Sequence, residues 1–285
     1  MAASAPYVLA GVMGWPVAHS RSPRMHTHWI KQYGLQGAYV ALAVAPANLE
    51  TALRSLPALG FAGCNLTIPH KVAAMAIVDH VDPLALRIGA INTIVVEADG
   101  SLTGKNTDAF GFIHSLRDAQ AHWRGDAGAA VVLGAGGAAR AVLAGLLDAG
   151  CPEVRLCNRT FATAQSLATE FGTRVHALPW QDRNEALRGA AVLVNTTNQG
   201  MQGESALHIT LDALPLTALV SDIVYVPLQT PLLQAAHARG NTTVNGLGML
   251  IHQARPAFEA WFGVLPDVSS ELQTALEETV PPAKM

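Results

Sequence analysis

The sequence predicts an α/β protein of two domains. Its 285 residues are more than one ordinary domain needs. Hydrophobic residues form 50% of the chain and charged residues 14%, which suits packed cores and argues against disorder. Short β-prone runs alternate with segments of helical period along the chain, and this alternation is typical of parallel sheets covered by helices.

The stretch 131–147 is the most informative part of the chain. A short β-branched run ends in a glycine turn, and an apolar pattern of helical period follows at once. Gly134 permits the tight turn, Gly136 lets the backbone approach a pyrophosphate, and Ala139 packs the helix against the strand. A further strand at 153–158 completes a βαβ unit. We therefore predict a Rossmann-type dinucleotide-binding domain, with the phosphates at the helix N-terminus.

The segments before this domain predict a second α/β domain. Strands are expected in four apolar or β-branched runs, at 7–13, 38–44, 63–69 and 88–96. Helices are expected to begin near residues 22, 47, 70 and 109. In the first of them Ser22 is the expected N-cap, because Pro23 follows it and suits a first helical turn. Asp99-Gly100 predicts a turn after the fourth strand.

The later segments continue the same alternation. Arg124-Gly-Asp-Ala-Gly128 leads into the glycine-rich stretch as a loop between domains. Further strands are expected at 174–178, 190–195 and 219–225, with helices ending near Gly172, spanning 230–240 and starting near 245.

Charge and cysteine content exclude several classes of protein. The formal net charge of −3 provides no basic field for nucleic acid. The apolar residues 128–150 do not form a membrane span, because Arg140 and glycines interrupt them. Three cysteines without a CxxC spacing, and no signal peptide, predict a cytoplasmic protein with reduced thiols. The 11 histidines are scattered, so no metal site is expected.

Several polar residues are candidates for a binding site, and each has a structural alternative. Ser20 and Ser22 could hold an anion at a helix N-terminus, although Ser22 could simply cap that helix. Lys71 follows the carboxyl end of a strand, where α/β sheets bind ligands, but its spacing alone favours a solvated lysine. Asn92 within an apolar strand needs a partner, which is either ligand or backbone. Asp108 could merely stabilise the dipole of its helix.

The end of the second Rossmann strand predicts the cofactor. Domains that bind NAD usually have Asp or Glu there, to accept the ribose 2′-hydroxyl. This chain has Asn158 followed by Arg159. A guanidinium can bind a 2′-phosphate that a carboxylate would repel, so NADP is expected rather than NAD.

Taken together, the motifs resemble those of the shikimate dehydrogenase family over about residues 7–265. They are Gly14-x-Pro-x-x-His-Ser-x-Ser-Pro23, Asn65-x-Thr-x-Pro-x-Lys71, Gly89-Ala-Ile-Asn-Thr93, Asn106-Thr-Asp108, Gly134-Ala-Gly-Gly-Ala138, Asn158-Arg-Thr160, Asp222-x-x-Tyr225 and Gly246-Leu-Gly-Met-Leu-x-x-Gln253. The resemblance implies NADP-dependent, reversible reduction of 3-dehydroshikimate to shikimate in aromatic amino-acid biosynthesis. It implies a substrate domain at 1–111 and 247–285, to which the C-terminal helix returns, and a dinucleotide-binding domain at 112–246.

The resemblance also implies roles that spacing cannot give. Lys71 and Asp108 would be the catalytic pair, with the lysine ammonium stabilising the developing alkoxide and donating its proton. The substrate-binding residues would be Ser20, Ser22, Thr67, Asn92, Tyr225 and Gln253. The cofactor-binding residues would be Gly134, Ala135, Gly136, Gly137, Ala138, Asn158, Arg159, Thr160, Thr196, Ile223, Gly246 and Met249. A small-molecule substrate is the expected partner, and a homodimer is compatible with the sequence, which leaves the oligomeric state open.

Some positions depart from the family pattern. Thr163 stands where many members have a basic residue, and the loop Thr196-Thr-Asn-Gln-Gly-Met201 and Pro256 are also unusual. Two rival functions follow from the same fold: a quinate or quinate/shikimate dehydrogenase that uses NAD(P), and a non-catalytic ligand sensor. The intact Ser20 and Ser22 favour shikimate over quinate, and the intact Lys71 and Asp108 argue against a sensor.

Overall fold

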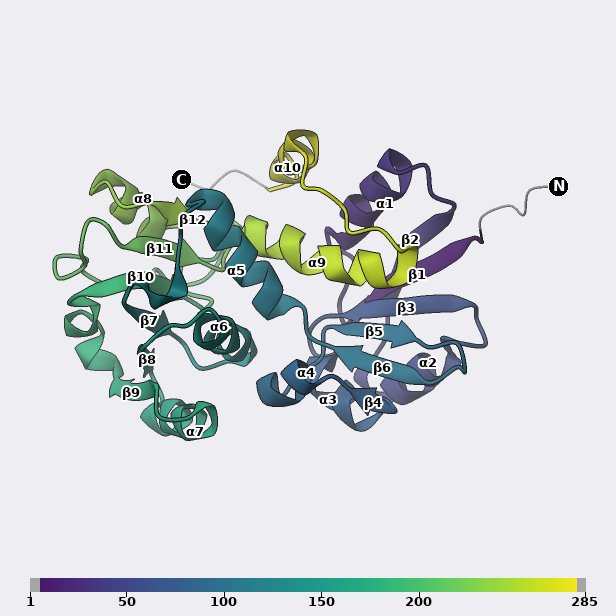
Figure 1. The fold of residues 1–285 in the computed structure, drawn as a ribbon, viewed down its shortest axis with the longest axis horizontal. Coiled ribbons are helices and arrows are strands. Elements are labelled where there is room, and N and C mark those ends of the chain that lie inside the picture. The colour runs from purple at the N-terminus through teal and green to yellow at the C-terminus, as the bar shows by residue number, and fades with distance from the viewer. Residues whose placement is uncertain (1–5, 281–285) are drawn as a thin grey trace. The chain divides into compact units, whose positions relative to one another are not determined.

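The computed structural model describes residues 6–280, and it confirms the α/β class. The chain forms two compact units. The first contains the residues up to Thr107 together with Gln253–Leu276, and the second contains Asp108–His252 and the residues from Glu277 on. Helix α9 (Gly246–Phe262) supplies residues to both and is one unbroken helix in Figure 1. No helix within residues 6–280 has the length and apolar character that crossing a membrane requires.

The first unit contains a mixed six-stranded sheet in the order β2-β1-β3-β5-β6-β4. Strands β1, β2 and β3 are parallel, β5 is antiparallel to β3 and β6, and β6 is parallel to β4. The strands are β1 (Val8–Gly14), β2 (Gly37–Ala43), β3 (Phe61–Leu66), β4 (His80–Val81), β5 (Thr93–Val96) and β6 (Leu102–Lys105). The helical segments are α1 (Ser22–Gln32), η1 (Pro46–Asn48), α2 (Leu49–Ser55), α3 (His70–Ala73), η2 (Ala74–Ala76) and α4 (Pro83–Ile88).

Two local predictions for this unit are wrong. The expected strand at 88–96 begins only at Thr93, because the preceding residues end helix α4, where Gly89 adopts a left-handed conformation. Ser22 is the first residue of α1 rather than its cap; the N-cap position belongs to Arg21, whose side chain makes no capping hydrogen bond. The Ser22 hydroxyl is therefore not used as a helix cap.

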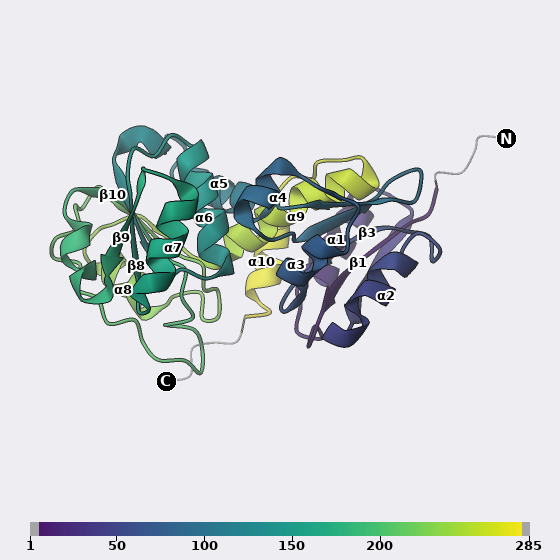
Figure 2. The same ribbon diagram turned by 90° about the horizontal axis from the view of Figure 1, so that it is seen from below.

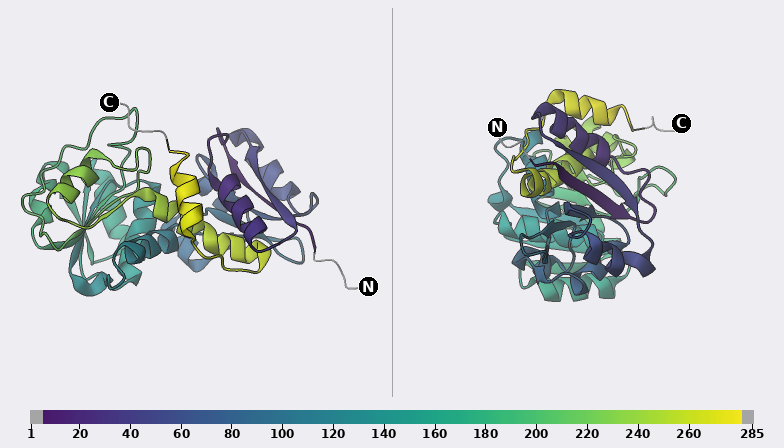
Figure 3. Two further views of the ribbon diagram at one scale, coloured as in Figure 1. Left: turned by 90° about the horizontal axis from the view of Figure 1, so that it is seen from above. Right: turned by 90° about the vertical axis from the view of Figure 1, so that its right-hand side faces the viewer.

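Aromatic side chains pack α1 and α9 against the first sheet. Trp29 is completely buried and meets Phe258 edge-on, with ring centroids 5.5 Å apart. The Trp29 indole donates a hydrogen bond to the carbonyl of Asp267 over 3.1 Å. This contact holds the segment before α10 (Ser270–Glu277) to α1, and the two helices lie side by side in both views of Figure 3.

The second unit contains a fully parallel six-stranded sheet in the order β9-β8-β7-β10-β11-β12. Counted within the unit, this is the 3-2-1-4-5-6 order of a Rossmann fold. The strands are β7 (Ala129–Leu133), β8 (Val154–Asn158), β9 (Val175–Pro179), β10 (Ala190–Asn195), β11 (Leu219–Asp222) and β12 (Thr243–Val244). The helical segments are α5 (Asp108–Ala119), η3 (Gly125–Ala127), α6 (Gly137–Asp148), α7 (Phe161–Phe171), η4 (Trp180–Arg183), η5 (Glu185–Leu187) and α8 (Pro231–Ala238).

Alternate residues of these strands form two separate cores on the two faces of the sheet. Val132 packs with α5, α6 and α7 on one face, and Val131 packs with α8, η5 and residues 207–218 on the other. Figure 2 shows this sheet between α6 and α7 on one side and α8 on the other. Helices on both faces explain why the strands are almost continuously apolar.

Candidate functional site

The glycine turn after β7 begins the candidate cofactor site of the second unit. Gly134 has a φ of +101°, and a Cβ atom there would lie 2.7 Å from the Thr196 hydroxyl oxygen, so only glycine fits. Gly136 caps α6 without any side-chain hydrogen bond, and a Cβ atom on it would meet nothing within 4 Å. The space beside Gly136 is therefore clear of protein atoms, at the helix end whose N–H groups suit a phosphate.

The loop after β10 lies opposite this turn. The Thr196 amide and hydroxyl both donate to the carbonyl of Leu133, over 2.8 and 2.7 Å. The Asn195 side chain holds the rest of the loop, since its Oδ1 accepts from Thr197 Oγ1 over 2.7 Å and its Nδ2 donates to the Gln199 carbonyl over 3.1 Å. Strands β7 and β10 are neighbours at which the strand order reverses, and this is where α/β sheets bind ligands.

A cavity of about 260 Å³ opens between these two loops. It is lined by Gly134, Ala135, Gly136, Asn158, Arg159, Trp180, Thr196, Thr197, Asn198 and Gln199. The sequence predicted six of these residues as cofactor contacts. Among the others, Trp180 was not foreseen, although it directly follows β9 and so lies at the same edge of the sheet. The Arg183 guanidinium lies 4.9 Å from the centre of the Trp180 ring and holds it in place.

The other six residues that were expected to bind the cofactor do not line this cavity. Gly137 and Ala138 begin α6, and Thr160 accepts a hydrogen bond from Asn158 Nδ2 through its carbonyl over 2.9 Å. Ile223, Gly246 and Met249 belong to the ends of β11 and the start of α9. At Gly246 a Cβ atom would lie 1.9 Å from the Ile223 carbonyl oxygen, so these two segments touch through backbone.

A buried carboxylate supports the end of β11. Asp222 is fully buried and accepts hydrogen bonds from Asn195 Nδ2, the Val224 amide and Thr230 Oγ1, over 3.0, 3.1 and 2.7 Å. Burial raises the pKa of Asp222 to about 6, although the three donors act in the opposite direction. The Thr230 hydroxyl also caps α8. Asp222 thus fixes the loop that carries Ile223 and Tyr225.

The candidate substrate residues of the first unit follow the carboxyl ends of β1 and β3. Ser20 and Ser22 come after β1, and the Ser22 amide donates to Ser20 Oγ over 3.3 Å. Thr67 and Lys71 come after β3, and this turn is tied down at both ends. The Thr67 amide donates to the Met13 carbonyl over 3.0 Å, and the Lys71 carbonyl accepts from the Ile91 amide over 2.9 Å.

Asn92 is the centre of a buried polar cluster in this unit. Its Nδ2 donates to Gln253 Oε1 over 3.2 Å and to Thr107 Oγ1 over 3.0 Å. Its Oδ1 accepts from the Thr107 amide over 2.9 Å and from Thr93 Oγ1 over 3.0 Å. The structure therefore brings together Asn92 and Gln253, two expected substrate residues that are 161 positions apart in sequence.

Two further polar residues of the cluster, Asn65 and Tyr39, were given no role from the sequence, although Asn65 begins one of the family motifs. Asn65 Nδ2 donates to the Asn92 carbonyl and to Thr93 Oγ1, both over 3.1 Å, and Asn65 Oδ1 accepts from the Tyr39 hydroxyl over 2.7 Å. Burial raises the pKa of Tyr39, and the nearby Cys64 acts in the same direction. The sequence signal that could have identified Asn65 is a polar Asn within the apolar run of β3.

The other two expected site residues, Asp108 and Tyr225, belong to the second unit. Asp108 is the first residue of α5 and lies half-buried, and Tyr225 follows the end of β11. Among residues 6–280, no group of three or more His, Cys, Asp or Glu residues is placed to hold a metal ion.

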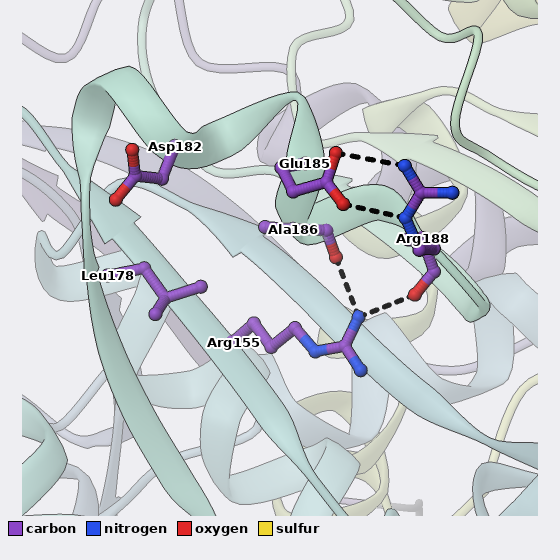
Figure 4. A pocket seen from close by; sticks show the side chains of 6 residues that line it. All are labelled: Arg155, Leu178, Asp182, Glu185, Ala186 and Arg188. Atoms are coloured by element: carbon purple, nitrogen blue, oxygen red, sulfur yellow. Dashed lines mark hydrogen bonds and ion pairs between the residues drawn. The ribbon is translucent and has the colours of Figure 1, made fainter.

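A second cavity of the same unit, of about 460 Å³, lies beside η4 and η5 (Figure 4). Its arginines are already engaged by neighbouring protein groups. Arg188 Nε pairs with Glu185 over 2.6 Å, and Arg155 Nη1 donates to the carbonyls of Ala186 and Arg188 over 2.8 and 2.7 Å. These contacts hold η5 against β8, so packing within the unit explains why these arginines lie beside the cavity.

The parallel sheet, the uncapped glycine turn and the cavity at the strand-order reversal define the second unit as a dinucleotide-binding domain of the oxidoreductase type. Family models match most of the chain. They are described as the shikimate dehydrogenase substrate binding domain at residues 12–94, shikimate / quinate 5-dehydrogenase at 119–203 and the shikimate 5'-dehydrogenase C-terminal domain at 246–270. The chain belongs to the shikimate dehydrogenase family, as the motifs predicted.

Individual relatives agree with this assignment. The chain is 59% identical to a shikimate dehydrogenase (NADP(+)) of Paramagnetospirillum magneticum, over 93% of this chain and 96% of that one. A shikimate 5-dehydrogenase of Thermus thermophilus, solved with NADP(H) and shikimate, is 40% identical with a TM-score of 0.82, over 96% and 98% of the two chains. A quinate dehydrogenase of Corynebacterium glutamicum, solved with NAD, is 32% identical with a TM-score of 0.87, over 95% and 99%.

Proposed function

We propose that this chain catalyses the reversible, NADP-linked reduction of 3-dehydroshikimate to shikimate. The observation that carries the proposal is the Asn92 cluster, in which side chains from β3, β5 and α9 offer hydrogen-bond donors and acceptors to a polyhydroxylated ring. The same chain has a dinucleotide-binding unit, which supplies a redox partner for that ring. High identity to relatives named for this activity supports the assignment.

The residues of the second unit fit NADP. The pyrophosphate would be held by the amides of Gly136 and Gly137, where added Cβ atoms would meet nothing within 4 Å. Arg159, exposed at the edge of the cavity, would bind the 2′-phosphate. When bound, the nicotinamide supplies a hydride donor or acceptor. Neither Asn158 nor Arg159 presents a carboxylate that would repel the 2′-phosphate.

The polar residues of the first unit bind the substrate. Ser20 and Ser22 donate hydrogen bonds to the substrate carboxylate, to which the family resemblance also assigns Tyr225. Thr67, Asn92 and Gln253 bind the ring hydroxyls. The Asn92 amide is buried and tied on both its oxygen and its nitrogen, so its geometry is fixed before substrate binds.

Lys71 and Asp108 are the catalytic residues. Reduction places negative charge on the substrate's carbonyl oxygen as the hydride arrives. The Lys71 ammonium stabilises this oxyanion and gives it a proton, and the reverse reaction returns the proton to the amine. The Asp108 carboxylate takes part in the same proton transfer. Helix α3 is short, but the Ile91 amide holds the Lys71 carbonyl and so fixes the base of the side chain.

Oxidation of shikimate by the purified protein tests the function. With NADP+ the absorbance of NADPH should rise, and 3-dehydroshikimate should appear in equal amount. Saturation curves with NAD+, and with quinate in place of shikimate, measure the two preferences. Catalytic efficiency that is equal or higher with NAD+ would refute the cofactor assignment, and faster oxidation of quinate would favour the rival dehydrogenase. A protein that binds both ligands without turnover would be a sensor.

Two further expectations belong to this proposal. The enzyme would act in the cytoplasm, which fractionation of the source cells would test. Assembly as a homodimer stays a prediction, and light scattering of the purified protein would measure it.

A further inference from the structure

Trp180 is an aromatic residue of the cofactor cavity that belongs to none of the family motifs. It directly follows β9 and is half-buried. The same cavity is lined by Asn158, the last residue of β8, and by Arg159. Asn158 pairs with Pro179 in the register of β8 and β9, so Arg159 and Trp180 leave the two neighbouring strands side by side.

Protein contacts hold Trp180 in place beside the cavity. Arg183 Nη1 donates to the Trp180 carbonyl over 2.8 Å, and the Arg183 guanidinium lies 4.9 Å from the centre of the indole ring. The guanidinium is itself fixed, because its Nε and Nη2 donate to the His208 carbonyl over 2.9 and 2.7 Å. Trp180 also packs against the core on the α8 face of the sheet. The cavity thus has an aromatic side chain that is placed before any ligand binds.

The order of the strands indicates which part of the cofactor reaches Trp180. Strand β8 lies between β7 and β9, and neighbouring strands are about 4.8 Å apart. The glycine turn after β7 would hold the pyrophosphate, and Arg159 after β8 would bind the 2′-phosphate. One strand further in the same direction, the next side chain is Trp180. Because the 2′-phosphate and the adenine are attached to one ribose, the adenine extends in this direction, and the nicotinamide lies on the other side of the pyrophosphate.

We propose that Trp180 binds the adenine ring of NADP by stacking. This inference rests on the proposed function, since it takes NADP as the cofactor and Arg159 as the contact of the 2′-phosphate. Adenine has a flat, uncharged π-face, which an indole can cover without any hydrogen bond. Trp180 therefore contributes affinity for the adenosine half of the cofactor and takes no part in hydride transfer.

Adenosine 2′,5′-bisphosphate tests this role, because it contains the adenine and the 2′-phosphate but no nicotinamide. Trp180→Leu keeps an apolar side chain toward the core and removes the aromatic face. The Kd for the bisphosphate and the KM for NADP+ should each rise about tenfold, the effect of one lost stacking contact. The kcat and the KM for shikimate should change little. Trp180→Phe keeps a smaller aromatic face, so its Kd should lie between those of the wild type and Trp180→Leu.

Phe161→Leu is the matched control. Phe161 is an exposed aromatic residue of the same unit, at the start of α7, and it does not line the cavity. Its replacement should leave the Kd for the bisphosphate unchanged.

Tryptophan fluorescence gives a readout that a purely structural role of Trp180 would not produce. A base that stacks on an indole quenches the indole emission, so the bisphosphate should quench part of the emission of the wild-type protein. In Trp180→Phe the same titration should leave the emission of the remaining tryptophans unchanged, at bisphosphate concentrations that calorimetry shows to be saturating.

A wild-type Kd for the bisphosphate in Trp180→Leu, or undiminished quenching in Trp180→Phe, would overturn the proposal. Weaker binding in Phe161→Leu but not in Trp180→Leu would do the same and would place the adenine against α7. If Trp180→Leu does not fold, the quenching in Trp180→Phe decides. Failure of the proposed function looks different, because binding of the bisphosphate needs no turnover and would persist in a protein that does not oxidise shikimate.

Discussion

In the first unit the candidate site is made of side chains that bind one another, whereas in the second it is made largely of backbone. Asn92 and Asn65 use both ends of their amides in hydrogen bonds within the protein. The turn at Gly134–Gly137 has no side chains of its own beyond one methyl group, and the space beside Gly136 and Gly137 is clear of protein atoms. A small polar ring needs many placed groups, whereas a pyrophosphate needs room and N–H donors. Deleting side chains should therefore harm the first site, and adding them should harm the second.

The largest effect is expected at Lys71. Lys71→Ala should lower kcat by about 10²–10⁴-fold, because the developing oxyanion loses its ammonium and its proton donor. The KM for shikimate should change little, since the polar cluster still binds the ring. Steady-state kinetics of shikimate oxidation measure both. Lys31→Ala, an exposed lysine in the last turn of α1, is the control. Near-normal turnover in Lys71→Ala would remove Lys71 from the chemistry.

Among the described residues that line the cofactor cavity, Arg159 is the only one with a charged side chain. Arg159→Ala should reduce the preference for NADP+ over NAD+ by about 100-fold, because the 2′-phosphate loses charge-assisted hydrogen bonds. The catalytic efficiency with NAD+ serves as the internal control and should stay constant. Equal losses with both cofactors would mean that Arg159 does not contact the 2′-phosphate.

Substitutions at two glycines of the same turn should have different effects, one on NADP+ binding and the other on stability. Gly136→Ala has open space and an ordinary φ of −88°, so the variant should keep its Tm while its KM for NADP+ rises about tenfold. Gly134→Ala meets the Thr196 hydroxyl at a φ of +101°, so it should lose about 1–3 kcal/mol of stability. Thermal melts with NADP+ titrations distinguish the two. A Gly136→Ala enzyme with normal NADP+ affinity would place the pyrophosphate elsewhere.

His26 is a buried polar residue of the first unit whose surroundings differ from those of Asn92 and Asn65. Neither of its ring nitrogens has a hydrogen-bond partner among residues 6–280, and burial lowers its pKa from 6.5 to about 3. Below pH 6.5 the His26 side chain is protonated in the unfolded chain, whereas in the folded chain it stays neutral down to about pH 3. The free energy of unfolding should therefore fall by up to about 1.4 kcal/mol per pH unit between pH 6.5 and 3. Urea unfolding measures this slope, and His26→Phe should remove its contribution. An identical slope in His26→Phe would contradict the assignment.

The second unit could be predicted from sequence more completely than the first. In the Rossmann unit one short stretch contains the strand, the turn and the helix that make the site, so local pattern was enough. Trp180 was not predicted because the neighbouring strand β9 brings it to the cavity. The sequence pattern of one strand does not show which residues of another strand lie beside it.

The first unit depends on contacts between distant segments. Asn65 and Asn92 meet because β3 and β5 are antiparallel, with Asn65 opposite Thr93, and no local signal gives that register. The wrong strand at 88–92 had a signal that was overlooked: Asp82 before Pro83 caps α4, accepting from the amides of Leu84 and Ala85 over 2.8 and 3.2 Å. The roles of Lys71 and Asp108 came from the family resemblance, because spacing alone favoured structural explanations for both.

Direct transfer of hydrogen between the two ligands is the central claim, and an isotope experiment measures it. Shikimate deuterated at the carbinol carbon that becomes the ketone would be oxidised with NADP+, and the reduced cofactor examined by mass spectrometry. One deuterium per molecule should appear on the nicotinamide ring, with a slower hydride-transfer step. Reduced cofactor free of deuterium, or the absence of reduced cofactor, would contradict the account.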